Sequence, residues 1–324
     1  MTETIPVAVP RKGRPLEAVL DRLATRVEDS HLSSERHGSE RSSTADLSAG
    51  VDVASLADSI SSILRYEKAI AKGEQTAADD VYERLAEYSD LSAPGRPEYT
   101  LLRDDRKGRP RRIVFDSVTI PLGDVELQLI GREEPFRALR THEFALGFDS
   151  ADLVLEEVVG LRAEPLESIA DLNARIDPRD TDVRVVAGLG DTVYHTLMGQ
   201  PDLRREGTDD AFDREFVREY EGPLCISPRY ERLVEAVLGT DAVEGVDFCY
   251  PQNGREEEAA IADAGLGVYL TVTGSTAREH GLELGERLFP SETVLMENLA
   301  ETNDGAGLVA DLFANASSDS ELTV

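Results

Sequence analysis

The chain has 324 residues, of which 40% are hydrophobic, so it is long enough to form two compact domains or one large one. Its 64 acidic residues outnumber its 34 basic ones and give a net charge of -30, which argues against nucleic-acid binding through a broad basic surface. The sequence contains no apolar run long enough to span a membrane and no signal-peptide pattern, so we expect a cytoplasmic protein.

The first predicted element is a short buried strand over Ile5–Pro10, which a basic turn follows. Apolar residues at helical spacing predict a helix directly after this turn. Free backbone amides and positive charge converge where a helix begins. Lys12, Gly13 and Arg14 are therefore candidates for binding an anion, although a solvated basic turn would have the same sequence.

Residues 28–97 are expected to form an insertion. From Glu28 to Gly50 the chain is polar and charged, and we expect disorder because it cannot bury enough apolar surface to offset its ordering entropy. An apolar stripe predicts a helix over Val51–Lys72, which Gly73 ends. A second helix is expected over Thr76–Tyr88, followed by a linker rich in proline and glycine. The insertion is thus a helical hairpin with a loose lead-in.

Residues 1–27 and 98–182 are expected to form the first lobe, an α/β unit. Strands are predicted at Tyr99–Leu102, Arg112–Phe115, Val118–Ile120, Val125–Ile130 and Phe144–Phe148, and a short helix at Phe136–Thr141. The pattern of Leu153–Val159 fits a helix or a strand. Asp149 and Asp152 follow a strand end, where they could bind a nucleotide base or a metal, and Asp152 could equally cap a helix.

Residues 183–298 are expected to form the second lobe, and residues 299–324 a C-terminal helix and tail. Strands are predicted at Val183–Ala187, Leu224–Ile226, Asp247–Tyr250, Val268–Val272 and Thr293–Asn298. Helices are predicted at Thr192–Met198, Tyr230–Leu238, Glu256–Ala264 and Leu308–Ala314, with one more in the polar excursion Pro201–Glu221.

The sharpest motif is Thr273-Gly274-Ser275-Thr276, a hydroxyl-rich turn between a buried strand and a helix. Gly274 lets the backbone approach a ligand closely. Amides at the helix start and the hydroxyls of Thr273, Ser275 and Thr276 can together donate to a phosphate group. The competing interpretation is a plain helix cap, because serine and threonine commonly precede helices.

Several segments carry a family pattern in the same order. A Thr-Gly-x-Thr-Leu loop followed by Asn-Gly-Leu corresponds to Thr273–Ala277 and His280–Leu282. The further matches are Val9–Leu16 with a Pro-Lys-Gly-Arg-Leu motif, His142–Asp152, Ile226–Tyr230, Leu295–Asn298, and Glu256 with Ala262–Ala264. In these features the chain resembles the ATP phosphoribosyltransferase family, which catalyses the first step of histidine biosynthesis. The resemblance covers most of the chain except Glu28–Pro97.

The resemblance implies an α/β, two-lobed, periplasmic-binding-protein-like (type II) fold with an inserted helical hairpin. It implies that ATP and phosphoribosyl pyrophosphate react to phosphoribosyl-ATP and pyrophosphate, with Mg²⁺ as cofactor. The phosphoribosyl phosphate would lie at Thr273, Gly274, Ser275 and Thr276, and the nucleotide phosphates or pyrophosphate at Lys12, Gly13, Arg14, Arg229 and Asp152. A homo-oligomer or a complex with a regulatory subunit is expected, in a member without the regulatory C-terminal domain.

Tyr269 departs from the family pattern, which has at this position an aspartate that contacts ribose hydroxyls. The departure keeps open a second hypothesis, a non-catalytic small-anion or nucleotide-binding regulatory protein on the same fold. A third hypothesis is a subunit of a hetero-oligomer, which the hairpin within 51–88 would help to dock. No residue is assigned as the catalytic acid or base.

The excess of carboxylates is typical of a protein adapted to concentrated salt, where self-repulsion is screened. The alternative is an acidic mesophilic protein with a disordered tail. Cys225 and Cys249 fit a reducing compartment. We expect them to be buried small hydrophobes, so a zinc site is not expected.

Overall fold

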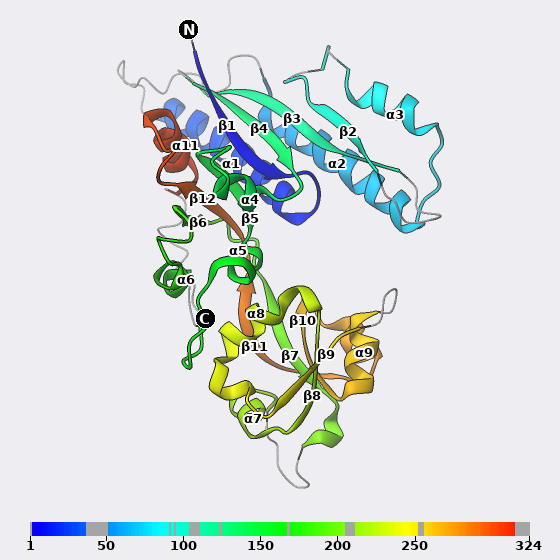
Figure 1. Ribbon diagram of the computed structural model, residues 1–324. Coiled ribbons are helices and arrows are strands. Elements are labelled where there is room, and N and C mark those ends of the chain that lie inside the picture. Colours follow the sequence, from blue (N-terminus) through cyan, green and yellow to red (C-terminus); the bar gives the residue numbers. More distant parts are fainter. Residues whose placement is uncertain are drawn as a thin grey trace. The chain divides into compact units, whose positions relative to one another are not determined.

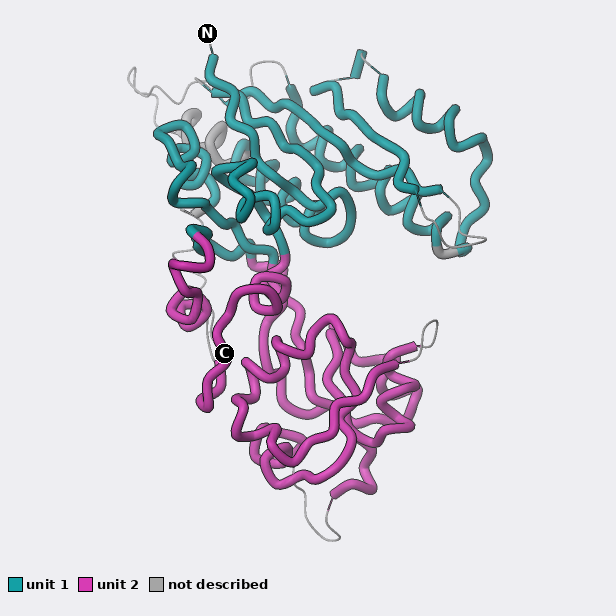
Figure 2. The backbone as a smooth tube through the Cα atoms, viewed as in Figure 1, with its two compact units in different colours: residues 1–149, 182–189, 293–319 teal, residues 150–181, 190–292, 320–324 magenta. Residues whose placement is uncertain are grey.

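The computed structural model describes residues 2–36, 51–90, 92–93, 95–103, 111–122, 125–166, 169–204, 211–251 and 256–314. The chain forms two compact units, coloured separately in Figure 2. Unit 1 contains residues 1–149, 182–189 and 293–319, and unit 2 contains residues 150–181, 190–292 and 320–324. Within the described residues, the chain therefore passes between the units four times. The bounds of the units differ from those of the expected lobes, because residues 150–181 join unit 2, whereas 183–189 and 293–298 join unit 1.

Unit 1 is built on a seven-stranded sheet. Its strands are β1 (Glu3–Pro10), β2 (Glu98–Leu102), β3 (Arg112–Leu122), β4 (Val125–Arg132), β5 (Leu146–Ser150), β6 (Val183–Gly188) and β12 (Thr293–Asn298). Their order is β2-β3-β4-β1-β5-β12-β6 (Figure 1). β1 is parallel to β4 and β5, whereas β12, which returns from unit 2, is antiparallel to β6. The sheet of unit 1 is therefore mixed, with parallel and antiparallel pairs.

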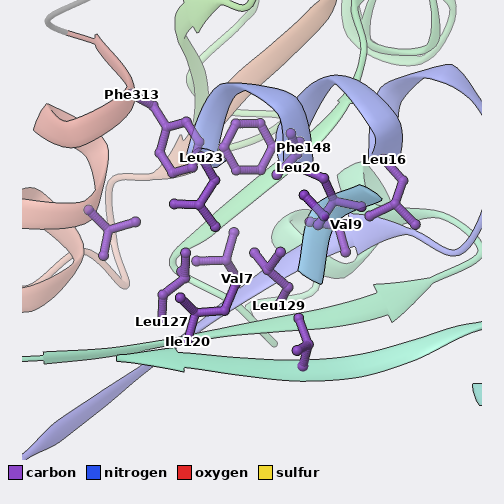
Figure 3. Close-up of a cluster of buried hydrophobic side chains, with 14 of the residues drawn as sticks. Val7, Val9, Leu16, Leu20, Leu23, Ile120, Leu127, Leu129, Phe148 and Phe313 are labelled. Atoms are coloured by element: carbon purple, nitrogen blue, oxygen red, sulfur yellow. The ribbon is translucent and has the colours of Figure 1, made fainter. Parts of the chain in front are cut away.

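The core of unit 1 lies between this sheet and the helices α1 (Arg14–Arg36), α2 (Val53–Lys72) and α11 (Asp304–Ala314). Leu20 and Leu23 of α1 belong to the same buried cluster as Val7 of β1 (Figure 3). The Phe148 and Phe313 rings meet edge to face, with centroids 4.8 Å apart. The helical stripe predicted after the basic turn is therefore the face that α1 buries. A short helix, α4 (Pro135–Arg140), lies near its predicted place.

The inserted helices belong to unit 1. α2 is capped by Asp52 at its start and by Gly73, at φ 79, at its end, as its sequence predicts. Its apolar stripe joins the core, and α3 (Val81–Tyr88) is fastened to it by Arg84 and Glu67, whose Nε and Oε1 atoms are 2.8 Å apart. α3 begins later than the predicted Thr76, because Asp80 supplies the N-cap.

Two predictions about local structure were wrong. α1 continues to Arg36, so at least residues 28–36 of the expected disordered segment are helical, and residues 37–50 lie outside the described part of the chain. A helix that is already nucleated by a packed stripe gains one hydrogen bond for each residue it adds. Thr192–Met198 forms a strand and not a helix. The secondary structure of a short apolar segment depends on its tertiary contacts, and here the segment pairs with two strands that are distant in the sequence.

Unit 2 is built on a five-stranded sheet of order β11-β7-β10-β8-β9. These strands are β7 (Val193–Gly199), β8 (Gly222–Ile226), β9 (Val246–Cys249), β10 (Leu266–Thr271) and β11 (Glu283–Ser291). The helices are α5 (Ala151–Val158), α6 (Ile169–Arg175), α7 (Arg214–Glu219), α8 (Glu231–Leu238), α9 (Glu257–Ala264) and α10 (Ser275–Glu279), with 3-10 turns η1 (Pro201–Leu203), η2 (Pro228–Tyr230) and η3 (Thr240–Val243). α5 resolves the ambiguous pattern of Leu153–Val159 in favour of a helix.

β11 and α6 were not predicted. β11 is an edge strand that contains Gly285 and Pro290 and has no alternating pattern of buried and exposed residues. Proline and glycine are tolerated at an edge, where one side of the backbone has no partner strand. The α/β class is confirmed by the two sheets and their covering helices. Within the described residues, no helix combines the length and the apolar character that crossing a bilayer requires.

Candidate functional site

The candidate site lies in unit 2, at the carboxyl ends of two neighbouring parallel strands. β8 and β10 pair in parallel, with Ile226 opposite Val268, so both chains leave the sheet at the same edge. The turn Ser227–Tyr230 follows β8, and the loop Val272–Gly274 follows β10. Ligands of open α/β sheets bind beyond the carboxyl ends of the strands. The fold thus brings the predicted phosphate loop and the predicted Arg229 to one edge.

The loop has the strand–turn–helix geometry that the sequence predicts. Gly274 adopts φ 68, in the left-handed region, and directly precedes α10. This backbone conformation favours glycine, and a Cβ atom at this position would also force the Leu284 side chain to move. No side chain caps α10. The Thr273 and Ser275 hydroxyls instead lie 3.2 Å from each other, and Thr276 is half-buried. The hydroxyls are therefore not used as the helix cap of the competing interpretation.

Further hydroxyl groups lie where β10 meets β7. The Thr196 and Thr271 hydroxyl oxygens are 2.5 Å apart, and each can donate to the Tyr194 carbonyl oxygen at 3.4 Å. Tyr269, which pairs with Thr196 in the register of these strands, is half-buried. Burial and the carboxylates of Glu257 and Glu258 raise the pKa of Tyr269 to about 12, so its hydroxyl stays protonated at any physiological pH.

Three exposed arginines surround this edge. Arg229 lies with its guanidinium carbon 5.9 Å from the Tyr230 ring centroid, and Arg287 lies 4.8 Å from that of Tyr194. Arg278 donates a hydrogen bond of 2.8 Å to the Thr273 carbonyl oxygen, which holds the loop. Within the described ranges, none of the three forms an ion pair with a carboxylate. In a chain with a net charge of -30, they supply local positive charge for an anion.

Asp152 is buried and paired, and does not face solvent as a ligand-binding carboxylate would. Its Oδ2 atom lies 3.3 Å from Nε2 of His195, and the two side chains are only 3% and 4% exposed. Burial raises the pKa of Asp152, but hydrogen bonds from His195, Ser150 and Tyr230 lower it by more, so the net pKa is below its usual value. The pair is an ionised carboxylate with fixed donors. Direct ligand binding by Asp152 stays a prediction.

The basic turn of the N-terminal segment lies in unit 1. Gly13 adopts φ 88 immediately before α1, which begins at Arg14. Nζ of Lys12 lies 3.5 Å from a carboxylate oxygen of Glu133, and Arg14 also has an interaction partner. The predicted strand, turn and helix are therefore present. Their charges are partly neutralised, so the anion-binding role of Lys12, Gly13 and Arg14 remains a prediction.

Sequence reasoning missed four residues near this edge: His195, Tyr230, Arg278 and Arg287. His195 lies in the segment Thr192–Met198, for which a helix was predicted, and the β-branched and aromatic residues around it were the available signal for a strand. No local sequence signal indicates that Arg287 lies near the site, because it belongs to β11, a strand that was not predicted. Among the described residues, no three His, Cys, Asp or Glu side chains form a group that could hold a metal ion.

The sequence profile of halobacterial ATP phosphoribosyltransferase matches residues 1–324. The chain belongs to this family. Membership confirms the resemblance found in the sequence and supports a transferase of this type. No curated protein matches the chain in a sequence comparison.

Among solved structures, an ATP phosphoribosyl transferase (HisG:HisZ) complex from Thermotoga maritima is similar over 73% of this chain and 90% of its own, with 13% identity and a TM-score of 0.34. A mutant of ArgBP from T. maritima is similar over 59% of this chain and 70% of its own, with 8% identity and a TM-score of 0.31. The regulatory domain of OxyR2 from Vibrio vulnificus is similar over 59% and 82%, with 12% identity and a TM-score of 0.32. These scores are too low to support an inference about activity.

Proposed function

We propose that this chain transfers the phosphoribosyl group of phosphoribosyl pyrophosphate to ATP. A bond forms between ATP and the anomeric carbon, and the bond from that carbon to pyrophosphate breaks, so phosphoribosyl-ATP and pyrophosphate leave in equal amounts. The observation that carries the proposal is the glycine loop after β10, in a chain whose whole length matches the family. The loop offers backbone amides and the hydroxyls of Thr273, Ser275 and Thr276 to a phosphate group.

The arginines at the same edge suit the leaving pyrophosphate. An arginine presents several fixed donors to phosphate oxygens, and negative charge grows on the pyrophosphate as its bond breaks. Arg229, Arg278 and Arg287 are exposed and have no carboxylate partner within the described residues. The reaction needs mainly positioning and charge stabilisation, because no covalent intermediate with the protein is required. In unit 1, we assign Lys12, Gly13 and Arg14 to a nucleotide phosphate.

Mg²⁺ would enter with phosphoribosyl pyrophosphate, bound to its pyrophosphate group. This ion commonly binds through one or two carboxylates, several waters and substrate phosphates. Glu257 and Glu258, in the first turn of α9, are the candidate carboxylate ligands, because both lie near Tyr269 and raise its pKa. When bound, the ion would neutralise part of the pyrophosphate charge.

Tyr269 favours one alternative, a small-anion or nucleotide-binding regulatory protein without turnover. Its hydroxyl, which interacts with Glu257, stands where the family pattern has an aspartate. Such a protein would bind phosphoribosyl pyrophosphate and form no product. We also propose that the chain assembles as a homo-oligomer or with a regulatory subunit, which gel filtration with and without a candidate subunit distinguishes.

The test is turnover by the purified chain with ATP, phosphoribosyl pyrophosphate and Mg²⁺ in concentrated KCl. We expect phosphoribosyl-ATP and pyrophosphate in equal amounts, and a loss of about tenfold or more in kcat/KM for Thr276→Val. Thr119→Val is the matched control, because Thr119 is also half-buried but lies on β3 of unit 1. Binding without product would favour the regulatory protein, and equal activity of the two variants would remove the loop from the site.

A further inference from the structure

Three side chains from separate elements of unit 2 converge next to Arg229. Asp152 comes from the first turn of α5, His195 from β7 and Tyr230 from the turn after β8. Asp152 and His195 are almost completely buried. Their Oδ2 and Nε2 atoms are 3.3 Å apart. Burying a polar pair of this kind contributes little to stability, so a role in fixing a conformation is the hypothesis to test.

The Asp152–His195 pair holds Tyr230 from two sides. The His195 and Tyr230 rings meet edge to face, with centroids 5.1 Å apart and an interplanar angle of 72°. The Tyr230 hydroxyl also interacts with the Asp152 carboxylate and stabilises its charged form. Burial and the Asp152 carboxylate raise the pKa of Tyr230, so this hydroxyl remains a donor. The position of the Tyr230 ring is therefore set by β7 and α5, and not only by its own turn.

Arg229 lies against this fixed ring. Its guanidinium carbon is 5.9 Å from the Tyr230 centroid. The turn itself is closed by Ser227, whose carbonyl oxygen accepts from the Tyr230 amide at 2.9 Å and whose hydroxyl accepts from the Arg229 amide at 3.4 Å. In the part of the chain that the structure describes, Arg229 has no carboxylate partner. The guanidinium therefore lies next to an aromatic ring and, within the described residues, is not neutralised by a carboxylate.

We propose that Asp152, His195 and Tyr230 are positioning residues that hold Arg229 ready to bind a diphosphate group. An arginine has many rotamers, and a ring that restricts them lowers the entropy lost when the guanidinium binds an anion. The proposal rests on the proposed function, which supplies the diphosphate. It also revises the expectation that Asp152 contacts the ligand, because Asp152 acts here through Tyr230.

The test is a double-mutant cycle with inorganic pyrophosphate as the probe, measured by calorimetry in concentrated KCl. Tyr230→Phe keeps the ring and removes the hydroxyl, and Arg229→Met removes the guanidinium. We expect Arg229→Met to weaken binding about tenfold or more and Tyr230→Phe about threefold. Tyr230→Phe should have no further effect in the Arg229→Met background. Thermal unfolding of each variant establishes that it is folded.

His195→Gln gives the second readout, because it keeps a donor for Asp152 and removes the ring that contacts Tyr230. We expect it to raise the KM for phosphoribosyl pyrophosphate about threefold and to leave kcat unchanged. A purely structural network would lower the melting temperature and leave pyrophosphate binding and KM as in the wild type. That result, or the same loss for Tyr230→Phe with and without Arg229, would overturn the proposal.

The two proposals fail in different ways. If the double-mutant cycle on pyrophosphate binding gives the expected result but no phosphoribosyl-ATP forms, the proposed reaction is contradicted and the positioning role of Asp152, His195 and Tyr230 is supported. If phosphoribosyl-ATP forms and Tyr230→Phe leaves both the pyrophosphate affinity and the KM unchanged, the positioning role is contradicted and the proposed reaction is supported. If the folded wild type does not bind pyrophosphate, the positioning proposal is contradicted.

Discussion

Arg84 donates a hydrogen bond of 2.8 Å from Nε to Oε1 of Glu67, and this ion pair between α3 and α2 is almost completely removed from solvent. The Arg84 side chain is 6% exposed and that of Glu67 is 1% exposed. The Tyr88 hydroxyl donates to the same carboxylate at 3.2 Å. The insertion is therefore joined to unit 1 by a buried polar network as well as by its apolar stripe.

Breaking this buried pair from one side should be costly. Arg84→Met leaves the Glu67 carboxylate buried without its cation, and we expect it to lower the free energy of unfolding by about 3 kcal/mol. Arg65→Met is the matched control, because Arg65 pairs with Glu17 at 2.7 Å from a position that is 62% exposed. Its loss should stay below about 1 kcal/mol. Urea unfolding in concentrated KCl measures both, and equal losses would contradict a buried role for Arg84.

The net charge of -30 predicts that salt stabilises the fold. Repulsion between carboxylates is screened as the Debye length falls from about 10 Å at 0.1 M salt to about 3 Å at 1 M. We therefore expect the melting temperature to rise with KCl over this range. Sucrose at matched water activity is the control, because it changes hydration and does not screen charge. A melting temperature that does not depend on KCl would contradict adaptation to salt.

The buried Asp152 predicts a loss of stability in acid. Its folded pKa lies below the usual value of 3.8, so it stabilises the folded state above about pH 4 and stops doing so as pH falls through the folded pKa. The difference in free energy of unfolding between wild type and Asp152→Asn should be largest near neutral pH and shrink below about pH 4. The exposed Asp247 of β9 offers the control, and Asp247→Asn should follow the wild type throughout. A difference that does not change with pH would mean that Asp152 is not ionised in the fold.

The strand, turn and helix around Gly274 could be predicted because their signals are local. A buried strand, a glycine that must adopt positive φ and the start of a helix lie next to one another in the sequence. The same holds for α2, whose caps Asp52 and Gly73 stand at its two ends. Local chemistry of this kind is sufficient to fix an element's type and its boundaries.

The pairing of Asp152 with His195 could not be predicted, because the two residues are 43 positions apart in the chain. The contact exists only once β7 takes its place between β10 and β11, and β7 itself depends on those non-local pairings. β11 has too irregular a pattern to be recognised alone. The division into units was equally hidden, since it follows from where the chain crosses between two sheets.

The central claim is that the Gly274 loop binds the phosphate of phosphoribosyl pyrophosphate, and one calorimetric comparison with Mg²⁺ in concentrated KCl tests it most directly. Gly274 and Gly281 both adopt positive φ, 68 and 74, but a Cβ meets Leu284 at the first and has nothing within 4 Å at the second. We predict that wild type and Gly281→Ala bind, and that folded Gly274→Ala binds at least about tenfold more weakly. Wild-type affinity in Gly274→Ala, or no binding by the folded wild type, would contradict the claim.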